Sequence, residues 1–246
     1  MAVPRIFDRA GTPVILGNEL GRGGEGAVYE MRGRPDSAAK IYLNPPNPER
    51  QAKLSAMTTM AARDLLRLAA WPTNTLHTQS GSVVGFVMPK VNGHSPVFKL
   101  YGPKLRLQQF PKADWRFLIH AAANAAIAFS KIHSAGVIIG DVNHGNLVVA
   151  ADATVQFIDC DSFQISKDSR IWFCEVGVDT HQPPEMQALN SYAKITRTTN
   201  HDNFGLAVCI FQLLCMGRHP FAGRYRGPGE PPSIPEKCKR RASRYL

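Results

Sequence analysis

Two carboxylates and one amide, set at fixed spacings, constrain this chain of 246 residues more than any other feature. Asn146 follows Asp141 by five positions, and Asp159 follows Asn146 by thirteen. Two short apolar runs, 147–150 and 155–158, lie between the last two and predict a strand–turn–strand hairpin. Because a hairpin brings its two ends to one edge, the three side chains are expected to face a common point. Their hard oxygen ligands suit Mg²⁺ better than zinc.

A glycine pattern near the start of the chain predicts a phosphate-binding hairpin. Gly21, Gly23 and Gly26 precede Val28 in a G-x-G-x-x-G-x-V arrangement with strand-like residues on both sides. Glycines let backbone N–H groups approach phosphates closely. A dinucleotide-binding fold would need a helix directly after the last glycine, whereas the residues after Gly26 favour a strand. A glycine-rich hairpin without a ligand is the alternative.

A lysine in an apolar strand is the next candidate. Lys40 lies in the run 38–42, and a buried ammonium group there needs a partner because its desolvation is costly. A helix predicted over 47–66 offers Glu49, nine residues after the lysine, or Asp64. The alternative for Glu49 is an exposed position near the helix start, where the helix dipole favours a carboxylate.

The remaining elements follow from periodicity and capping. A second hairpin is predicted over 75–78 and 83–88, and a helix over 113–133 with Asp114 as its N-cap. A further apolar helix begins near Asp202 and runs to residue 216.

These signals, with a Pro-Pro-Glu sequence ending at Glu185, resemble the motifs of protein kinases, in the same order, over residues 13–221. The resemblance implies an α+β, two-lobe fold. The N-lobe, residues 1–90, would hold an antiparallel sheet and one helix, and the C-lobe, residues 91–246, would be mostly helical and truncated relative to the family. The segments Trp71-Pro72 and Gly85-Phe86-Val87-Met88-Pro89 are also similar to a bacterial Ser/Thr-kinase-like subgroup in which some members carry C-terminal helix-hairpin-helix modules.

The resemblance also implies roles for individual residues and a requirement for ATP and Mg²⁺. Asp141 would receive the proton of a substrate hydroxyl, Lys40 would orient the phosphates under the glycine hairpin, and Asn146 with Asp159 would hold Mg²⁺. Asp202 would accept backbone N–H bonds from the catalytic loop, Glu49 would pair with Lys40, and Glu185 would end the activation segment. Further nucleotide contacts would come from Val28, Ala38, Met88, the backbone of Lys90 and Val91, and Val148.

Departures from the family pattern limit what is implied. Gly140 stands where the family has Arg before the catalytic Asp, so we expect no dependence on phosphorylation of Ser162, Ser166, Ser169 or Thr180. Asn143 replaces a Lys that would face the γ-phosphate. We expect His144 to be an exposed loop residue and Asp161, in place of the glycine of the metal-binding turn, to face solvent.

Three functions therefore stay open. The first is transfer of phosphate to Ser or Thr of a protein, the second a pseudokinase that regulates a partner, and the third a small-molecule kinase. The net charge is +10, and residues 218–246 hold eight of the 29 basic residues against two acids, so nucleic acid contact is expected only through this tail or through a module absent from the chain. Five cysteines without a C-x-x-C pair favour a reducing cytoplasm, and the apolar run 204–216 is too short for a membrane span.

Overall fold

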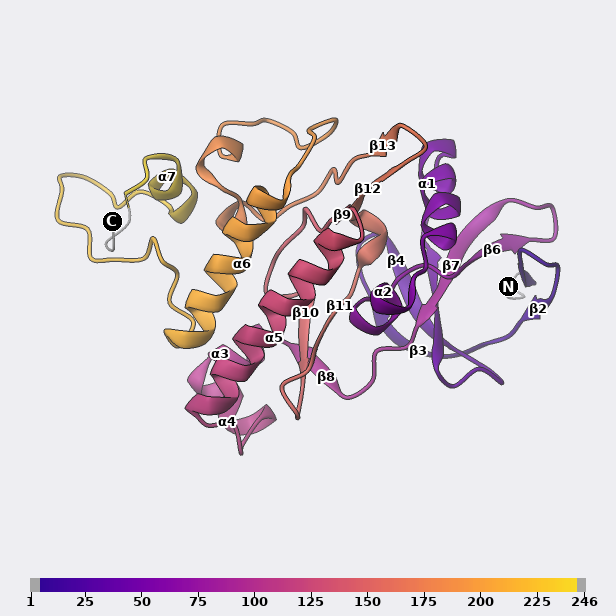
Figure 1. The fold of residues 1–246 in the computed structure, drawn as a ribbon, viewed down its shortest axis with the longest axis horizontal. Helices are drawn as coiled ribbons and strands as arrows, with labels where there is room; N and C mark the ends of the chain where they lie inside the picture. Colours follow the sequence, from indigo (N-terminus) through magenta and orange to yellow (C-terminus); the bar gives the residue numbers. More distant parts are fainter. Residues whose placement is uncertain (1–4, 243–246) are drawn as a thin grey trace. The chain divides into compact units, whose positions relative to one another are not determined.

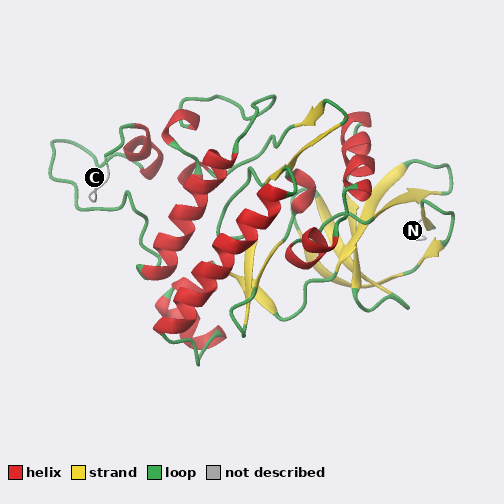
Figure 2. Ribbon diagram, in the orientation of Figure 1, coloured by secondary structure: helices red, strands yellow, loops and turns green. Residues whose placement is uncertain are grey.

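The computed structural model describes residues 5–242 and divides into two compact units. The N-terminal unit extends to Asn92 and the C-terminal unit begins at Gly93, two residues after the division expected from the sequence. Strands dominate the first unit and helices the second (Figures 1 and 2). Residues 243–246, the end of the basic tail, lie outside the described residues.

The N-terminal unit is built on a seven-stranded antiparallel sheet with the order β2-β1-β6-β7-β5-β4-β3. One face carries a core cluster to which five strands contribute, with members Ile6, Met31, Ala39, Leu76 and Val87. The strands are β1 (Ile6–Asp8), β2 (Pro13–Val14), β3 (Leu16–Arg22), β4 (Gly26–Met31), β5 (Ser37–Tyr42), β6 (Asn74–Thr78) and β7 (Val83–Pro89).

Side-chain alternation along β5 sends Lys40 to the face opposite this cluster. Lys40 pairs with Val28 on β4 and with Phe86 on β7, and directly opposed residues of neighbouring strands share a face. The strands approach closely at Gly85, where a Cβ atom would lie 2.0 Å from the carbonyl oxygen of Lys40. Only glycine fits there, so the position of Lys40 depends on the bare backbone of β7.

The helix predicted over 47–66 is interrupted. Helix α1 (Pro48–Thr59) begins at the N-cap Asn47 and ends at Met60, and α2 (Arg63–Leu68) follows after an extended Ala62. The hydroxyl groups of Thr58 and Thr59 donate to the carbonyl oxygens three residues earlier, at 2.8 and 2.7 Å. Such side-chain bonds compete with helical backbone bonds, and β-branched residues disfavour continuation.

The C-terminal unit combines helices with two small antiparallel sheets. One sheet has the order β11-β10-β8 and the other β13-β12-β9. The strands are β8 (His94–Pro96), β9 (Val137–Ile138), β10 (Leu147–Ala150), β11 (Val155–Phe157), β12 (Gln164–Lys167) and β13 (Arg170–Trp172). The helices are α3 (Phe98–Tyr101), α4 (Pro103–Gln109), α5 (Trp115–Ser134), α6 (Thr199–Leu214) and α7 (Ile234–Lys239), with 3₁₀ turns η1 (Cys160–Ser162), η2 (Asp179–His181) and η3 (Pro184–Met186).

Helices α5 and α6 lie side by side and form the helical centre of this unit (Figure 1). Asp114 caps α5 by accepting from the backbone N–H of Phe117 at 2.8 Å, as its place before the apolar periodicity predicted. The buried face of α5 is rich in alanine, which allows close packing. Among residues 5–242, none of the helices combines the length and hydropathy that crossing a membrane would require.

Candidate active site

The candidate catalytic loop, residues 139–146, is shaped by an asparagine at its centre. The side-chain oxygen of Asn143 accepts from the backbone N–H groups of Gly145 at 2.8 Å and Asn146 at 3.1 Å. Its Nδ2 donates to the carbonyl oxygen of Asp141 at 3.2 Å. An asparagine that bonds to backbone on both sides closes a tight local turn, so Asn143 holds the first and last functional side chains of the loop near each other.

Asp141 and Asn146, predicted from their spacing, are in direct contact. Asn146 Nδ2 donates to the Asp141 carboxylate at 2.9 Å and to its carbonyl oxygen at 3.2 Å. The other carboxylate oxygen, Oδ1, is buried and has no hydrogen-bond partner among the described residues. A buried carboxylate oxygen without a partner is unfavourable and needs an explanation, so Oδ1 is the atom of Asp141 whose role the proposed function has to account for.

The surroundings of Asp141 shift its proton affinity. Burial raises the pKa of its carboxyl group above the ordinary value, while the nearby side-chain amides of Asn143 and Asn146 oppose that rise. The negative charge of Asp159 raises the pKa further, and the positive charge of Arg197 lowers it. Mutual influence of this kind indicates that both charged groups lie near Asp141.

Asp202 anchors the loop from the first turn of α6. Its two carboxylate oxygens accept from the backbone N–H groups of Ile139 at 2.7 Å and Gly140 at 2.8 Å, and His133 Nε2 lies 2.9 Å from Oδ2. The side chain is 1 % exposed. The structure thus contains the contact that sequence comparison with the family implied, because one carboxylate satisfies two buried backbone donors at once.

Gly205, one turn further along α6, lets the loop approach the helix. A Cβ atom at this position would lie 2.7 Å from Cγ1 and 2.8 Å from Cβ of Val142, and 3.1 Å from the carbonyl oxygen of His181. Sequence reasoning did not single out this glycine, because a glycine within an apolar helix does not reveal which segment packs against it.

The candidate metal-binding turn begins at Asp159, which has a left-handed backbone conformation with φ of 60°. The backbone N–H of Ile158 donates to the carbonyl oxygen of Asn146 at 2.9 Å, so the turn and the loop are joined directly. The expectation that Asp161 faces solvent is wrong: its side chain is 2 % exposed within η1. Cys160, the first residue of the same 3₁₀ turn, is also buried, so the turn as a whole packs into the protein.

The oxygen atoms of Asn146 and Asp159 suit Mg²⁺ better than a metal ion whose ligands all come from the protein. The amide nitrogen of Asn146 is engaged with Asp141, so its amide oxygen is left to face a cation. Among the described residues, no group of three His, Cys, Asp or Glu side chains could form a metal cage. Mg²⁺ is commonly bound by one or two protein oxygens, with waters and phosphate oxygens completing the shell. Asn146 and Asp159 both offer oxygen donors of this kind.

His144 is not the exposed residue that was expected. It lies half-buried, with its ring against Phe98, Tyr101 and His181 at centroid distances of 5.8, 6.0 and 5.2 Å, and Tyr101 Oη is 3.1 Å from its Nδ1. Burial lowers the pKa of His144. The ring is therefore neutral near neutral pH and cannot replace the missing lysine as a cation.

Arg197 is a site residue that sequence reasoning missed. It precedes α6, is 2 % exposed, and donates to the carbonyl oxygens of Gly140 and Val176. Its neighbours in the sequence are mostly polar, and nothing in them distinguishes a buried arginine from an exposed one.

In the N-terminal unit, Lys40 is 6 % exposed, and its Nζ lies 5.8 and 5.9 Å from the ring centroids of Tyr42 and Phe86. These distances are in the range of cation–π attraction. Glu49 and Asp64 are both exposed, and all three charged groups make further contacts. Which carboxylate serves Lys40 therefore stays a prediction.

The glycine hairpin has the predicted form, because strand β4 begins at Gly26. Gly26 lies so close to β5 that a Cβ atom would be 2.6 Å from the carbonyl oxygen of Ile41. In contrast, a Cβ at Gly21 or Gly23 meets no atom within 4 Å. Packing inside the protein therefore requires glycine at the third position only. Val28 and Ala38 share the sheet face of Lys40, and Val148 lies buried in β10 of the other unit.

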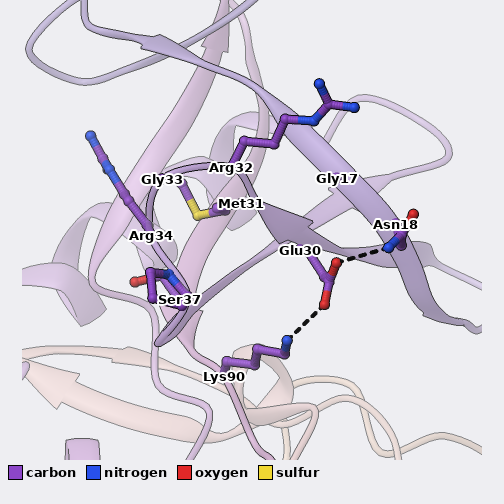
Figure 3. Close-up of a pocket in the computed structure, with 10 residues that line it drawn as sticks. Gly17, Asn18, Glu30, Met31, Arg32, Gly33, Arg34, Ser37 and Lys90 are labelled. Atoms are coloured by element: carbon purple, nitrogen blue, oxygen red, sulfur yellow. Dashed lines mark hydrogen bonds and ion pairs between the residues drawn. The ribbon is translucent and has the colours of Figure 1, made fainter.

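Lys90 departs in part from expectation. Its backbone N–H, expected to serve adenine, donates instead to the carbonyl oxygen of Asp36 at 2.9 Å, because the turn before β5 reaches that edge. Its side chain pairs with Glu30 at 2.8 Å in a hollow of about 310 Å³, where Asn18 also bonds to Glu30 (Figure 3). The backbone of Val91 and the buried Met88 remain candidates for adenine contact.

Glu185 lies exposed in η3, and its carboxylate is 3.8 Å from His201 Nε2 in the first turn of α6. This contact is weak, since it is ionic only when the histidine ring is protonated.

No family model matches the chain. A relative called Protein kinase YegI from Escherichia coli K12 is 46 % identical over 220 residues, which cover 89 % of this chain and 34 % of that protein. The protein of the same name from E. coli O157:H7 is 46 % identical over 221 residues, with the same coverage. The chain thus spans about a third of the length of these curated relatives.

A solved structure described as the ROP18 kinase domain in complex with AMP-PNP and sucrose has a TM-score of 0.60 to this chain. The identity is 16 %, and the match covers 89 % of this chain and 69 % of that one. At this identity the likeness shows the fold, an α+β arrangement with an antiparallel sheet and a helical part.

Proposed function

We propose that this chain, which is protein kinase-like in its sequence and its fold, transfers the γ-phosphoryl group of ATP to a serine or threonine hydroxyl of a protein. The relatives of 46 % identity carry the name protein kinase, and the structural neighbour was solved with a nucleotide analogue. Both support phosphoryl transfer from ATP. The choice of a protein hydroxyl as acceptor is part of the proposal.

The observation that carries the proposal is the state of Asp141. One carboxylate oxygen is fixed by Asn146, and the other is buried without a partner among the described residues. A general base needs an oriented acceptor within hydrogen-bond reach of the hydroxyl that it serves. Asp202 and Gly205 hold the loop from α6, so the acceptor is positioned before any substrate binds.

Asn146 and Asp159 would hold Mg²⁺, which would supply positive charge at the phosphate oxygens. Lys40 would orient the phosphates, and the glycine hairpin would approach them with backbone N–H groups. The hairpin supports this role because glycine at positions 21 and 23 is not required by packing. Close approach to a ligand is then the physical reason for glycine there.

One observation favours a pseudokinase as the second candidate. The family places a lysine at the position of Asn143, where this side chain is fully used in closing the loop. Together with the neutral His144, this leaves no side-chain cation in the described loop 139–146 to neutralise charge on the transferred group. A protein that binds ATP without transferring phosphate would carry such a loop.

The test is incubation of the chain with radiolabelled ATP, Mg²⁺ and a generic protein acceptor, with the wild type beside Asp141→Ala. We expect label transfer by the wild type and none by the variant, while both bind nucleotide equally in a thermal-shift titration. Asp152→Asn is the matched control, because Asp152 is an exposed carboxylate in the turn between β10 and β11.

Loss of transfer in the Asp152 variant as well would show that the effect of Asp141 is not specific. Nucleotide binding by the wild type without label transfer to any acceptor would select the pseudokinase. Transfer to an aminoglycoside or another small hydroxyl compound, with none to protein, would select a small-molecule kinase.

A further inference from the structure

Arg197 is buried beside the candidate catalytic loop, yet the proposed reaction gives it no task. It lies two residues before α6 and is 2 % exposed. Arginine is always charged in proteins, and burying its charge is costly unless the donors are satisfied. The partners of its side chain therefore indicate what the residue does.

The guanidinium group joins the loop to the downstream segment, residues 174–192. Nη1 donates to the carbonyl oxygen of Gly140, which directly precedes Asp141, and to Gln182 Oε1 at 3.4 Å. Nη2 donates to the carbonyl oxygen of Val176 at 2.7 Å. Gln182 Nε2 also reaches the carbonyl oxygen of Gly140, at 3.3 Å. Four contacts thus converge on the backbone next to Asp141 and on two points of the downstream segment.

The backbone of Arg197 is fixed by a second amide side chain. Its N–H donates to Gln164 Oε1 at 2.8 Å, and its carbonyl oxygen accepts from Gln164 Nε2 at 2.8 Å. Gln164 is the first residue of β12 and pairs with Ile138 on β9, just before the loop. Both the backbone and the side chain of Arg197 are therefore tied to the same region, and its orientation is not free to change.

The surrounding backbone leaves no spare room. Gly140 has φ of 71°, and a Cβ atom there would lie 2.5 Å from Cβ of Cys174 and 3.3 Å from Cδ of Arg197. At Gly177 a Cβ would be 3.2 Å from Arg197 Nη2. The ring of Tyr192 covers the guanidinium at 4.8 Å. Glycine at positions 140 and 177 lets the backbone pass close to the side chain of Arg197.

We infer that Arg197 is the positioning residue of Asp141, and that it orders the downstream segment in place of a phosphorylated side chain. A phosphate orders such segments elsewhere by pairing with exposed arginine. Here the arginine is enclosed and its Nη1 and Nη2 bond to protein acceptors, so a phosphate cannot reach it. The inference rests on the proposed function of Asp141. It adds that Arg197 holds Asp141 in position without phosphorylation of the downstream segment.

Arg197→Met tests the inference, because methionine keeps much of the apolar volume and removes every donor. We expect kcat to fall on the order of 100-fold, the effect of about 1 Å of misplacement at a reacting group, with KM for ATP unchanged. Arg197→Lys keeps the charge but not the planar fork, so it is expected to lose kcat while keeping more stability. Arg116→Met, at an exposed position of α5, is the matched control.

Hydrogen exchange measured by mass spectrometry gives a readout independent of activity. In Arg197→Met, peptides covering 138–146 and 174–182 should exchange about tenfold faster, while peptides of α5 keep their protection. Glutamate at the exposed Ser166 and Ser169 should leave both kcat and exchange unaltered. Gln182→Met, which removes two of the four contacts and leaves both Arg197 bonds to backbone carbonyl oxygens, is the milder variant if Arg197→Met fails to fold.

Unchanged exchange and unchanged kcat in Arg197→Met would overturn the inference, as would a kcat that rises tenfold or more with Ser166→Glu or Ser169→Glu. If kcat falls equally in Arg197→Met and Arg197→Lys, and only as much as the fraction of folded protein falls, Arg197 contributes packing and does not position Asp141. If the wild type transfers no phosphate, the proposed function fails, but the exchange experiment still decides whether Arg197 holds the loop.

Discussion

Replacement of Gly205 by alanine sets two opposing effects against each other. Gly205 is buried in α6, where alanine is the better helix former by about 0.8–1.0 kcal/mol. On helix propensity alone the variant would be more stable than the wild type. The added methyl group, however, enters the space occupied by Val142 of the candidate catalytic loop.

The distances decide which effect is larger. The new Cβ would lie 2.7 Å from Cγ1 and 2.8 Å from Cβ of Val142. Rotation of the valine can move Cγ1 but not Cβ, and the carbonyl oxygen of His181 at 3.1 Å closes the other side. Overpacking of this kind costs about 1–3 kcal/mol. Because two of these contacts are shorter than 3.0 Å, the cost should lie at the upper end of this range. After the gain in helix propensity is subtracted, we expect Gly205→Ala to lose about 2 kcal/mol, roughly 4–8 °C in Tm for a chain of this size.

The assay is urea unfolding of Gly205→Ala beside Ala207→Gly. Ala207 is an exposed position of the same helix, so Ala207→Gly measures the helix propensity difference without a packing change. Because the loop must move away from α6, phosphate transfer by Gly205→Ala should fall more than its folded fraction does. If Gly205→Ala gains as much stability as Ala207→Gly loses, the contact with Val142 carries no energy and the reasoning is refuted.

Three further outcomes are expected. Asp202→Asn replaces one carboxylate oxygen by an NH₂ group that cannot accept, so unfolding by guanidinium should show a loss of about 2–4 kcal/mol; a loss below about 0.5 kcal/mol would contradict this. Burial lowers the pKa of His181 from 6.5 to about 4, so unfolding takes up a proton and stability should fall as pH drops through this window, by about 3 kcal/mol in full; an equal pH dependence in His181→Asn would exclude His181 as the source. Trp71→Phe loses the bond from Nε1 to the Met57 carbonyl at 2.9 Å and should cost at least about 1 kcal/mol in thermal unfolding, whereas no change would show that this buried bond is replaced by another.

Features that depend on neighbouring residues could be predicted from the sequence. The hairpin between Asn146 and Asp159 follows from two apolar runs and a turn residue, and the structure has strands β10 and β11 at those places. Helix α5 follows from its periodicity and its N-cap. The spacing between Asp141 and Asn146 is short enough for one loop to hold both, so their contact was also within reach.

Features that depend on distant segments could not be predicted from the sequence. Whether His144 is exposed is decided by Phe98 and His181, which lie far from it in the sequence. The burial of Arg197 is decided by Gly140, 57 residues earlier. Local pattern carries no information on such contacts, because a polar stretch looks the same whether a distant backbone bonds to it or water does.

The anchoring of the loop by Asp202 also has a consequence for synthesis on the ribosome. The donors Ile139 and Gly140 are made 63 and 62 residues before the acceptor. Local hairpins such as β10–β11 can form as soon as they emerge, but the loop must await α6. A nascent chain that ends before Asp202 would therefore bear every side chain proposed for catalysis and still lack the conformation that aligns them.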